Sequence, residues 1–365
     1  MEDMVTINNY FWLNRRVLVT GHTGFKGSWL SLWLSMLGAK ICGISLEKLD
    51  QYNLFSELNL INQISYHNIC DIRNLRAIKK IIKEFQPEII FHLAAQPLVI
   101  TSYHEPINTW ETNVLGTVNI LESLKVLKGT CAAVLVTTDK VYKNKEQNTG
   151  YQEQDTLGGY DPYSSSKAAA ELAIESWRSS FFKDHKYNVR IASARAGNVI
   201  GGGDWTESRL IPDIVNSIIK KNKCKIRNSA AIRPWQHVLE PLSGYLILAE
   251  KLFTNPKTNN IYCSSYNFGP NLDSHCEVKE VIKICFDNWK GYWEDCSNDL
   301  NFHETKKLNL QIQKAKNELN WIPIWDINKT IEKTINWYKY FYNKSNNAEY
   351  LCMRDIEDFQ KEIFK

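Results

Sequence analysis

Short, unbroken apolar runs alternate with amphipathic segments through the first half of the chain. The runs lie at 16–21 (RVLVTG), 39–45 (AKICGIS), 63–70 (QISYHNIC), 87–95 (PEIIFHLAA), 132–138 (AAVLVTT) and 188–197 (NVRIASARAG). After the first run, Trp29, Leu30, Trp33 and Leu34 fall on one helical face, and Gly38 predicts its end. Further helices are predicted at 74–85, at about 112–124 and from about residue 164 onward. The pattern is therefore β-α-β-α.

Strands that are apolar along their whole length are buried on both faces, as in a parallel sheet covered by helices on each side. We therefore expect an α/β fold with a doubly wound parallel sheet and right-handed crossovers. After about residue 196 the alternation fades, and loops rich in Gly, Trp and Pro follow. This shift predicts a first domain at 1–195, completed by part of 234–262, and a smaller second lobe within 196–365.

Composition narrows the class of protein. With 365 residues the chain exceeds the roughly 250 to 300 residues at which single cores stop growing. The net charge of +4 is small and the lysines are scattered, so nucleic acid is not an expected partner. Nine cysteines without a C-x-x-C pair indicate free thiols and no metal site, as in the cytoplasm. The most hydrophobic segment, at 28–46, is interrupted by Ser, Gly and Lys residues, so it is not predicted to span a membrane.

A glycine loop follows the first predicted strand and opens the first helix. Gly21, Gly24 and Gly27 form a G-x-x-G-x-x-G spacing in VTGHTGFKGSWL. Glycines let the backbone turn sharply and approach a pyrophosphate, whose charge is favoured at a helix N-terminus. In this position the loop predicts a dinucleotide site, whereas a plain strand-to-helix turn is the alternative.

The second strand ends without the acid that usually binds the cofactor ribose. Ser45 stands at that place, and Glu47 follows slightly late. Because no Arg stands there either, NAD is favoured over NADP. Asp71, just after the third strand, is a candidate to accept from the adenine amino group, although it could equally cap the helix at 74.

Tyr163 and Lys167 form a Y-x-x-x-K pair at the start of an Ala-rich helix. This spacing places both side chains on one helical face. A lysine cation beside a phenol favours the phenolate and lowers the pKa of the tyrosine. Such a tyrosine can take a proton from an alcohol while a nicotinamide takes the hydride.

These motifs resemble those of the extended short-chain dehydrogenase/reductase family, a Rossmann-type fold with a nucleotide-sugar-binding lobe. The similarity is most specific to its CDP-glucose 4,6-dehydratase branch, through FHLAAQPLV, YDPYSSSKAAAEL, RAGNVIGGGDW, RLIPDI and IRPWQHVLEPLSGYL, and it extends to the tail LCMRDIEDF. The resemblance implies an NAD-dependent hydro-lyase of bacterial deoxysugar biosynthesis that acts on CDP-glucose. The implied cofactor residues are Gly21, Thr23, Gly24, Phe25, Lys26, Gly27, Asp71, Ile72, Leu93, Ala94, Ala95, Thr137, Tyr163 and Lys167.

The same resemblance assigns roles to the polar end of the strand at 132–138. Asp139 would protonate the departing C6 hydroxyl, Lys140 would remove the C5 proton, and Thr138 would hydrogen-bond the C4 oxygen. These roles need a protonated carboxyl and a neutral amine. Burial favours both states and mutual attraction opposes both, so the sequence leaves the outcome open. A solvated strand end with an ordinary Asp-Lys pair is the alternative.

The substrate residues implied by the resemblance follow the sixth strand. Asn198 would contact the sugar diphosphate, with Arg209 and Arg233 as its guanidinium partners. Gln96 would lie near the sugar, and Gln236 and His237 come from the RPWQHV block. Trp205 and Trp235 are the two tryptophans that could lie near the base or the sugar. His92 is expected in the core and His104 on the surface.

Three alternatives remain at this point. The chain could act on another nucleotide sugar, as a 4,6-dehydratase or an epimerase, or it could bind NAD without catalysis. An epimerase would leave Asp139 and Lys140 unexplained, and a sensor would have no use for these two together with Tyr163 and Lys167. The family also implies a homodimer, with helices near 106–126 and 164–183 as the candidate interface.

Overall fold

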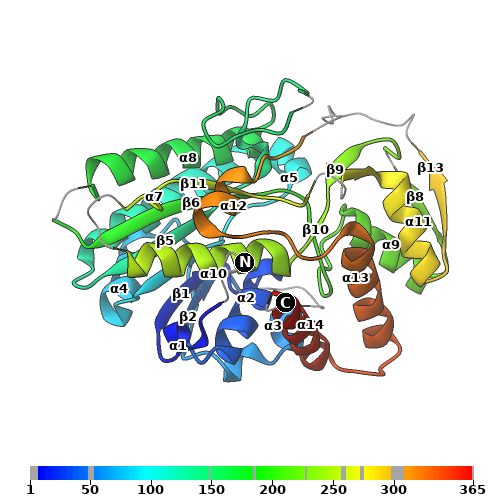
Figure 1. Ribbon diagram of the computed structural model, residues 1–365, viewed down its shortest axis with the longest axis horizontal. Helices are drawn as coiled ribbons and strands as arrows, with labels where there is room; N and C mark the ends of the chain where they lie inside the picture. The colour runs from blue at the N-terminus through cyan, green and yellow to red at the C-terminus, as the bar shows by residue number, and fades with distance from the viewer. Residues whose placement is uncertain are drawn as a thin grey trace.

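A seven-stranded parallel sheet forms the larger lobe of the computed structural model (Figure 1). The structure describes residues 7–47, 53–147, 149–183, 186–226, 228–255, 260–271, 275–296 and 308–363. The sheet order is β11-β6-β5-β4-β1-β2-β3, and each neighbouring pair is parallel. The strands are β1 (Arg16–Thr20), β2 (Lys40–Ser45), β3 (Tyr66–Ile69), β4 (Ile89–His92), β5 (Cys131–Val136), β6 (Val189–Ala196) and β11 (Ser265–Phe268). The predicted doubly wound sheet is confirmed.

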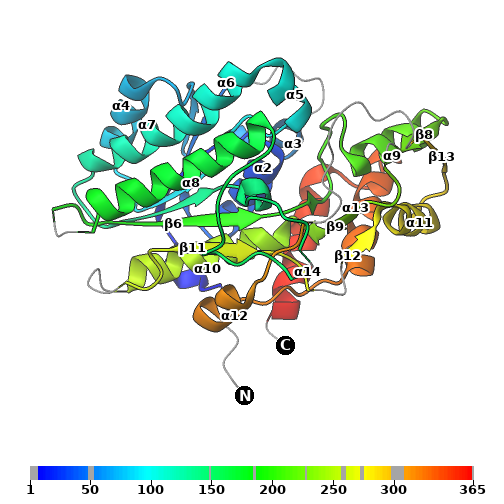
Figure 2. The ribbon, with the colours of Figure 1, turned by 90° about the horizontal axis from the view of Figure 1, so that it is seen from above.

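Helices cover both faces of this sheet. Figure 2 shows α4 (Leu75–Phe85), α7 (Gly116–Ser123) and α8 (Pro162–Ser180) on one side and α10 (Leu239–Thr254) on the other, with α2 (Phe25–Met36) and α14 (Ala348–Ile363) also packed there. Along β1, Val17 and Val19 face the α2 and α10 side, whereas Leu18 faces the α4 and α7 side. Both faces of each strand are therefore buried, which explains their unbroken apolar runs.

Shorter helices connect the strands of the larger lobe. They are α1 (Asn9–Trp12), α3 (Leu54–Glu57), α5 (Val99–His104), α6 (Pro106–Trp110), α12 (Gln313–Leu319), the 3₁₀ turns η1 (Leu60–Asn62), η3 (Leu124–Val126) and η4 (Asp139–Val141), and the π-helix η2 (Glu111–Leu115). The η2 turn breaks the regular helix between α6 and α7, so the single helix predicted at 112–124 is a composite of π, α and 3₁₀ turns.

The described residues of the smaller lobe form two-stranded sheets and three helices. The pairs are β7 (Val199–Ile200) with β10 (Gln236–His237), β8 (Lys223–Ile226) with β13 (Tyr292–Asp295) and β9 (Ile232–Pro234) with β12 (His275–Glu277); the helices are α9 (Leu210–Ile219), α11 (Val278–Asn288) and α13 (Ile327–Tyr342). Between these elements the chain returns to the larger lobe, where α10 packs on β5 and β6 and β11 adds the last strand beside β6.

The C-terminal segment is attached to α10 by a buried carboxyl group. Glu240 is fully buried and accepts from the backbone N–H groups of Ile324 and Trp325 at 2.6–3.1 Å. Further along, Phe359 of α14 packs edge-to-face on Trp33 of α2. The tail thereby supports the helix that follows the glycine loop. Within the described residues, no helix is both long and apolar enough to cross a membrane.

Candidate active site

A cavity of about 1820 Å³ lies at the carboxyl ends of the parallel strands, between the two lobes. In doubly wound sheets ligands bind at this edge, near the point where the strand order reverses, here between β1 and β4. Pockets for single small ligands have volumes of about 300–1,000 Å³. The cavity is therefore large enough for two ligands side by side.

The glycine loop forms one end of this cavity, and its packing requires glycine at two positions. Gly21 has φ of +73°, and a Cβ there would lie 2.8 Å from the backbone N of Ala94. A Cβ on Gly27 would lie only 2.1 Å from the carbonyl oxygen of Gly21. The α2 helix starts at Phe25, and no side chain caps its N-terminus. Its first N–H groups are thus left for a ligand with negative charge.

The ends of β2 and β3 bound the part of the cavity that is predicted to hold the adenosine half of the cofactor. Ser45 and Glu47 line it as the sequence predicts. Asp71 also lines the cavity, but its carboxylate already accepts from the backbone N–H of Arg73 at 2.8 Å and from its guanidinium at 2.6 Å. These bonds hold the pKa of Asp71 below its usual value. The helix at 75 is capped by Asn74, which accepts from Ala77, so the capping alternative for Asp71 is wrong.

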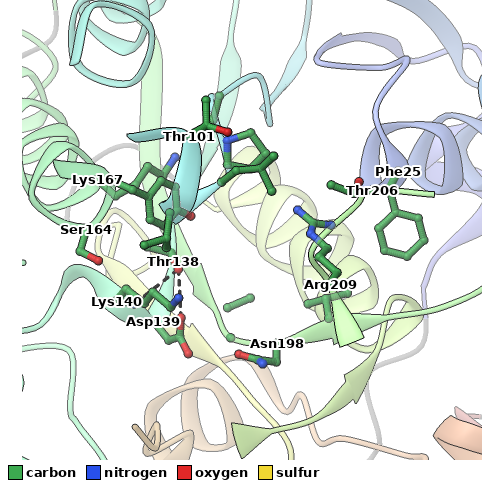
Figure 3. A pocket seen from close by; sticks show the side chains of 18 of the residues that line it. Phe25, Thr101, Thr138, Asp139, Lys140, Ser164, Lys167, Asn198, Thr206 and Arg209 are labelled. Carbon is green, nitrogen blue, oxygen red and sulfur yellow. Dashed lines mark hydrogen bonds between the residues drawn. The ribbon is translucent and has the colours of Figure 1, made fainter. Parts of the chain in front are cut away.

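Thr138, Asp139 and Lys140 follow directly after β5 and point into the cavity (Figure 3). The Thr138 hydroxyl donates to Oδ1 of Asp139 at 2.9 Å and accepts from the Lys140 backbone N–H at 3.4 Å. This short turn fixes the threonine, the acid and the lysine relative to one another.

Asp139 is buried, with 2% of its surface exposed. Its Oδ2 has no hydrogen-bond partner among the described residues and packs against Gly197, where a Cβ would lie 2.8 Å away. Burial raises the pKa of Asp139, and the charge of Lys140 only partly offsets this. For the carboxyl, burial outweighs the attraction of the lysine charge. Lys140 is less enclosed, being half-buried at the cavity wall.

Tyr163 and Lys167 lie in the first turns of α8, which Asp161 caps by accepting from the Ser164 N–H at 2.9 Å. Both side chains line the cavity, and Lys167 Nζ donates to the carbonyl of Val136 at 3.0 Å. Burial lowers the pKa of Lys167 to about 8. The Y-x-x-x-K pair therefore faces the end of β5, as its spacing predicts.

The expected lowering of the Tyr163 pKa is wrong for the protein alone. Burial raises the pKa of Tyr163 to about 12, and a hydrogen bond with Thr138 offsets this only in part. The loss of water around the phenol disfavours the phenolate more strongly than the neighbouring groups favour it.

The opposite wall carries the side chains predicted to bind a diphosphate. Asn198, Arg209 and Arg233 all line the cavity. Figure 3 shows Asn198 and Arg209 across the cavity from Thr138. Arg209 forms an ion pair with Asp204 at 2.8 Å, which holds the guanidinium at the start of α9. Two guanidinium groups thus face the acid and lysine of the β5 end.

Comparison with known proteins agrees with this arrangement. The model of the family described as GDP-mannose 4,6 dehydratase matches residues 18–334, which covers both lobes. The chain belongs to this family. A curated relative, CDP-glucose 4,6-dehydratase of Salmonella typhimurium, is 43% identical over 361 residues, covering 97% of this chain and 98% of its own.

Two solved structures show the same fold. One is dTDP-glucose 4,6-dehydratase of Bacillus anthracis in complex with NAD, which is 23% identical, covers 90% of this chain and 98% of its own, and has a TM-score of 0.73. The other is dTDP-glucose 4,6-dehydratase of Streptomyces venezuelae with NAD and TYD bound, which is 21% identical at the same coverage and TM-score. The fold of nucleotide-sugar dehydratases therefore extends over nearly the whole chain.

In this member of the family, three residues predicted to bind substrate lie away from the cavity. The Gln96 amide folds back, donating to Leu98 O and Thr109 and accepting from the Leu98 N–H. Gln236 is buried and donates to the carbonyl of Phe268 at 3.0 Å. His237 is fully buried between the rings of Trp29 and Trp325, and burial lowers its pKa to about 3. In the structure all three side chains bond or pack within the protein.

Most of the other residues predicted near the cofactor or the substrate line the cavity, but Trp205 does not. The remaining predicted cofactor residues, Thr23, Phe25, Lys26, Ile72, Leu93, Ala94, Ala95 and Thr137, all line the cavity. Trp235 also lines it, whereas Trp205 packs on Tyr338 and Phe341 in the smaller lobe. As expected, His92 is buried in the core and His104 is exposed.

Two buried polar residues near the site were not predicted. Asn113, in the π-helix η2, donates to Ser166 of α8 at 2.9 Å and accepts from the Gln96 N–H at 2.8 Å. It thereby joins the loop after β4 to the catalytic helix. Glu171 lies one turn after Lys167 and pairs with Arg195 at 2.8 Å. In the sequence both residues lie in segments that are predicted to be ordinary helices. In the structure, the irregular η2 turn distinguishes the segment that carries Asn113.

Proposed function

We propose that this chain is an NAD-dependent CDP-glucose 4,6-dehydratase, which converts CDP-D-glucose to CDP-4-keto-6-deoxy-D-glucose and water. The observation that carries the proposal is that Asp139, Lys140, Tyr163 and Lys167 all line one large cavity at the end of β5. The curated relative with 43% identity supports the choice of nucleotide sugar. The residues of the site support the type of reaction.

The residues present fit a dinucleotide. The close packing of Gly27 on Gly21 brings the start of α2 to the cavity, and its uncapped N–H groups suit a pyrophosphate. Ser45 at the end of β2 leaves room for ribose hydroxyls without a cation that would select a 2′-phosphate. When bound, NAD⁺ would supply the chemistry of hydride removal from C4 and hydride return to C6.

Tyr163 is the proton acceptor for the C4 hydroxyl in this proposal. Its phenol lies in the cavity and is hydrogen-bonded with Thr138, which can also contact the C4 oxygen. With a pKa of about 8, Lys167 is mainly an ammonium at neutral pH, and its positive charge favours the phenolate. The pair thereby prepares the oxygen that becomes a ketone.

Asp139 and Lys140 divide the elimination of water between them. A ketone at C4 acidifies the C5 proton, which Lys140 removes. Asp139 gives its proton to the hydroxyl that leaves C6. Burial keeps this carboxyl protonated to higher pH, and its Oδ2 has no protein partner within the described part of the chain. Lys140 returns a proton to C5 when the hydride reaches C6. Tyr163 then releases the proton of the C4 hydroxyl to solvent, and Asp139 takes up one proton from solvent, which restores the site.

The substrate is held by the smaller lobe. Arg209 and Arg233 can each bind phosphate oxygens of the nucleotide diphosphate, and Asn198 can donate to the same group. The hexose would then point toward the end of β5. Because Gln96, Gln236 and His237 bond or pack within the protein, they take no part in this binding.

We also place the enzyme in the cytoplasm as a homodimer. None of the nine cysteines, all of which lie in the described part of the chain, forms a disulfide, which suits a reducing compartment. Exposed apolar side chains gather on α6, η2 and α8, where Ile107, Trp110, Leu115 and Leu172 are 43–74% exposed. A two-fold contact through these helices would cover them. Sedimentation should show a dimer that Leu115→Lys converts to monomer; a monomeric wild type would contradict this.

The activity is tested by incubating the purified protein with NAD⁺ and, separately, CDP-, UDP-, dTDP- and GDP-glucose. We expect a 4-keto-6-deoxy product from CDP-glucose, detected by the absorbance of the ketone in alkali and by mass spectrometry. Turnover of dTDP-glucose alone would refute the choice of nucleotide. A C4 epimer without loss of water would identify an epimerase, and no turnover of any sugar would refute the enzyme proposal.

A further inference from the structure

A buried carboxylate lies directly behind the catalytic pair. Glu171 is one helical turn after Lys167 on α8, and 2% of its side chain is exposed. One oxygen accepts from the hydroxyl of Thr137 on the β5 end. The other accepts from Ser193 Oγ and from the Arg195 guanidinium on β6, each at 2.8 Å. A single side chain thereby ties α8 to two central strands.

This carboxylate and the Lys167 ammonium attach to consecutive residues of β5. Lys167 Nζ donates to the carbonyl of Val136, and Thr137 donates to Glu171. Thr138 and Asp139 follow directly, and Figure 3 shows Lys167 beside Thr138. Whatever fixes Thr137 therefore also fixes the start of the turn that carries the acid.

The charges around Lys167 make Glu171 electrostatically important. Lys167 faces His92 on β4, which is neutral because burial lowers its pKa to about 3, and Lys26 on α2, which is another cation. Burial lowers the pKa of Lys167, and the Glu171 charge acts against this. Glu171 itself stays ionised, because Arg195 and three hydrogen bonds outweigh the effect of burial.

The groups around Glu171 also include other charges. Arg178 lies on its own helix, and Arg195 is in turn bonded to Tyr142 at 2.8 Å and to the backbone of Glu153. Lys314 of α12 adds a more distant cation on the same side. The anion of Glu171 is thus paired with Arg195, and its charge still acts on the Lys167 ammonium.

We propose that Glu171 is a positioning residue for Lys167: its carboxylate holds the strand end to which the ammonium is anchored and supplies an anion that faces it. Glu171 touches neither substrate nor cofactor. The proposal rests on the proposed function for the role of Lys167, but it concerns a residue of the YDPYSSSKAAAEL motif to which the resemblance assigns no role.

The test compares Glu171→Gln with Ser193→Ala. The first variant keeps the shape of the side chain and removes its charge. The second removes one hydrogen bond to the same carboxylate and keeps the charge. For each variant, the rate of 4-keto product formation and the affinity for NAD⁺, followed by tryptophan fluorescence, are measured from pH 6 to 10. Thermal unfolding is recorded alongside as a measure of structural damage.

We expect activity and NAD⁺ affinity in Glu171→Gln to fall at a pH lower by about half a unit or more than in the wild type, because the lysine loses its proton earlier. Ser193→Ala should lower the unfolding temperature without moving either pH profile. If Glu171→Gln is too unstable, because Arg195 is left unpaired, Glu171→Gln/Arg195→Gln is measured in the same way. pH profiles that coincide with the wild type in the folded charge-removing variant would overturn the proposal.

The two proposals fail separately. An inactive wild type would refute the proposed function, while the NAD⁺ affinity profiles would still test Glu171. An active wild type with an unmoved Glu171→Gln profile would refute only the role of Glu171.

Discussion

Gly27→Ala tests whether the close packing of the glycine loop creates the cofactor site. The added Cβ would lie 2.1 Å from Gly21 O and 2.7 Å from the Cα of His22. Non-bonded atoms pack at roughly 3.5 Å, so the loop and the start of α2 must separate by about 1.4 Å. Both neighbours are backbone atoms, and no side-chain rotation can relieve this contact.

The expected magnitude follows from this overlap. Overpacking of this kind costs about 1–3 kcal/mol. If the loop relaxes outward, restoring its binding geometry costs the same energy, so NAD⁺ affinity should fall about 5-fold to about 150-fold. Calorimetric titration with NAD⁺ measures the affinity, and urea unfolding measures the stability that remains.

Two matched variants calibrate the result. A Cβ on Gly24 lies 3.2 Å from Gly21 O, so Gly24→Ala needs only a small adjustment. A Cβ on Gly129 has no atom within 4 Å, so Gly129→Ala should leave affinity and stability unchanged. If Gly27→Ala binds NAD⁺ as tightly as Gly129→Ala does, the reasoning about the loop is refuted.

Three further predictions concern buried or catalytic charges. Asp139→Asn cannot protonate the leaving hydroxyl, so product formation should fall about 10²- to 10⁴-fold with NAD⁺ affinity unchanged; an activity near wild type would exclude the acid role. Lys140→Met should still reduce the cofactor in a single turnover, seen as near-ultraviolet absorbance, but should block elimination; normal product formation would refute the base role. Burial raises the pKa of Glu240 to about 8, above about 4.3 in the unfolded chain, so its stabilising proton is lost as pH rises to 8. Urea unfolding should therefore show that the free energy of unfolding of Glu240→Gln rises relative to that of the wild type by about 1.4 kcal/mol per pH unit from pH 5 to 8. Parallel pH dependences of the two proteins would contradict this.

The sequence predicts the strands of the larger lobe well, because a strand buried on both faces is apolar throughout. The run at 132–138 and the strand at 188–197 correspond to β5 and β6. In contrast β11, with the sequence SYNF, is too short and polar to be recognised. Its place in the sheet depends on pairing with β6, a long-range contact that local patterns do not encode.

The site was predicted best where spacing along one element determines geometry. Tyr163 and Lys167 share a helical face, and Thr138, Asp139 and Lys140 share a strand end, so their meeting in the cavity follows from the fold. Motif membership was a weaker guide. Arg233 and His237 belong to one motif, yet Arg233 lines the cavity and His237 packs between two tryptophan rings.

Charge states were the least predictable part. The sequence shows Lys167 near Tyr163, but the pKa of the tyrosine depends on how much water the fold removes from the phenol. The Glu171–Arg195 pair was missed for a related reason. Its members lie in a helix and in a strand 24 positions apart, and nothing in either segment indicates that they meet.

The central claim is that one active site oxidises C4, eliminates water across C5 and C6, and delivers the same hydride to C6. CDP-glucose carrying deuterium at C4 tests this directly in ordinary water with the wild-type protein and NAD⁺. The account predicts a CDP-4-keto-6-deoxyglucose product that carries the deuterium at C6. A product without deuterium at C6 would contradict it. So would the absence of any keto product, with all of the deuterium still at C4 of the substrate or of its C4 epimer.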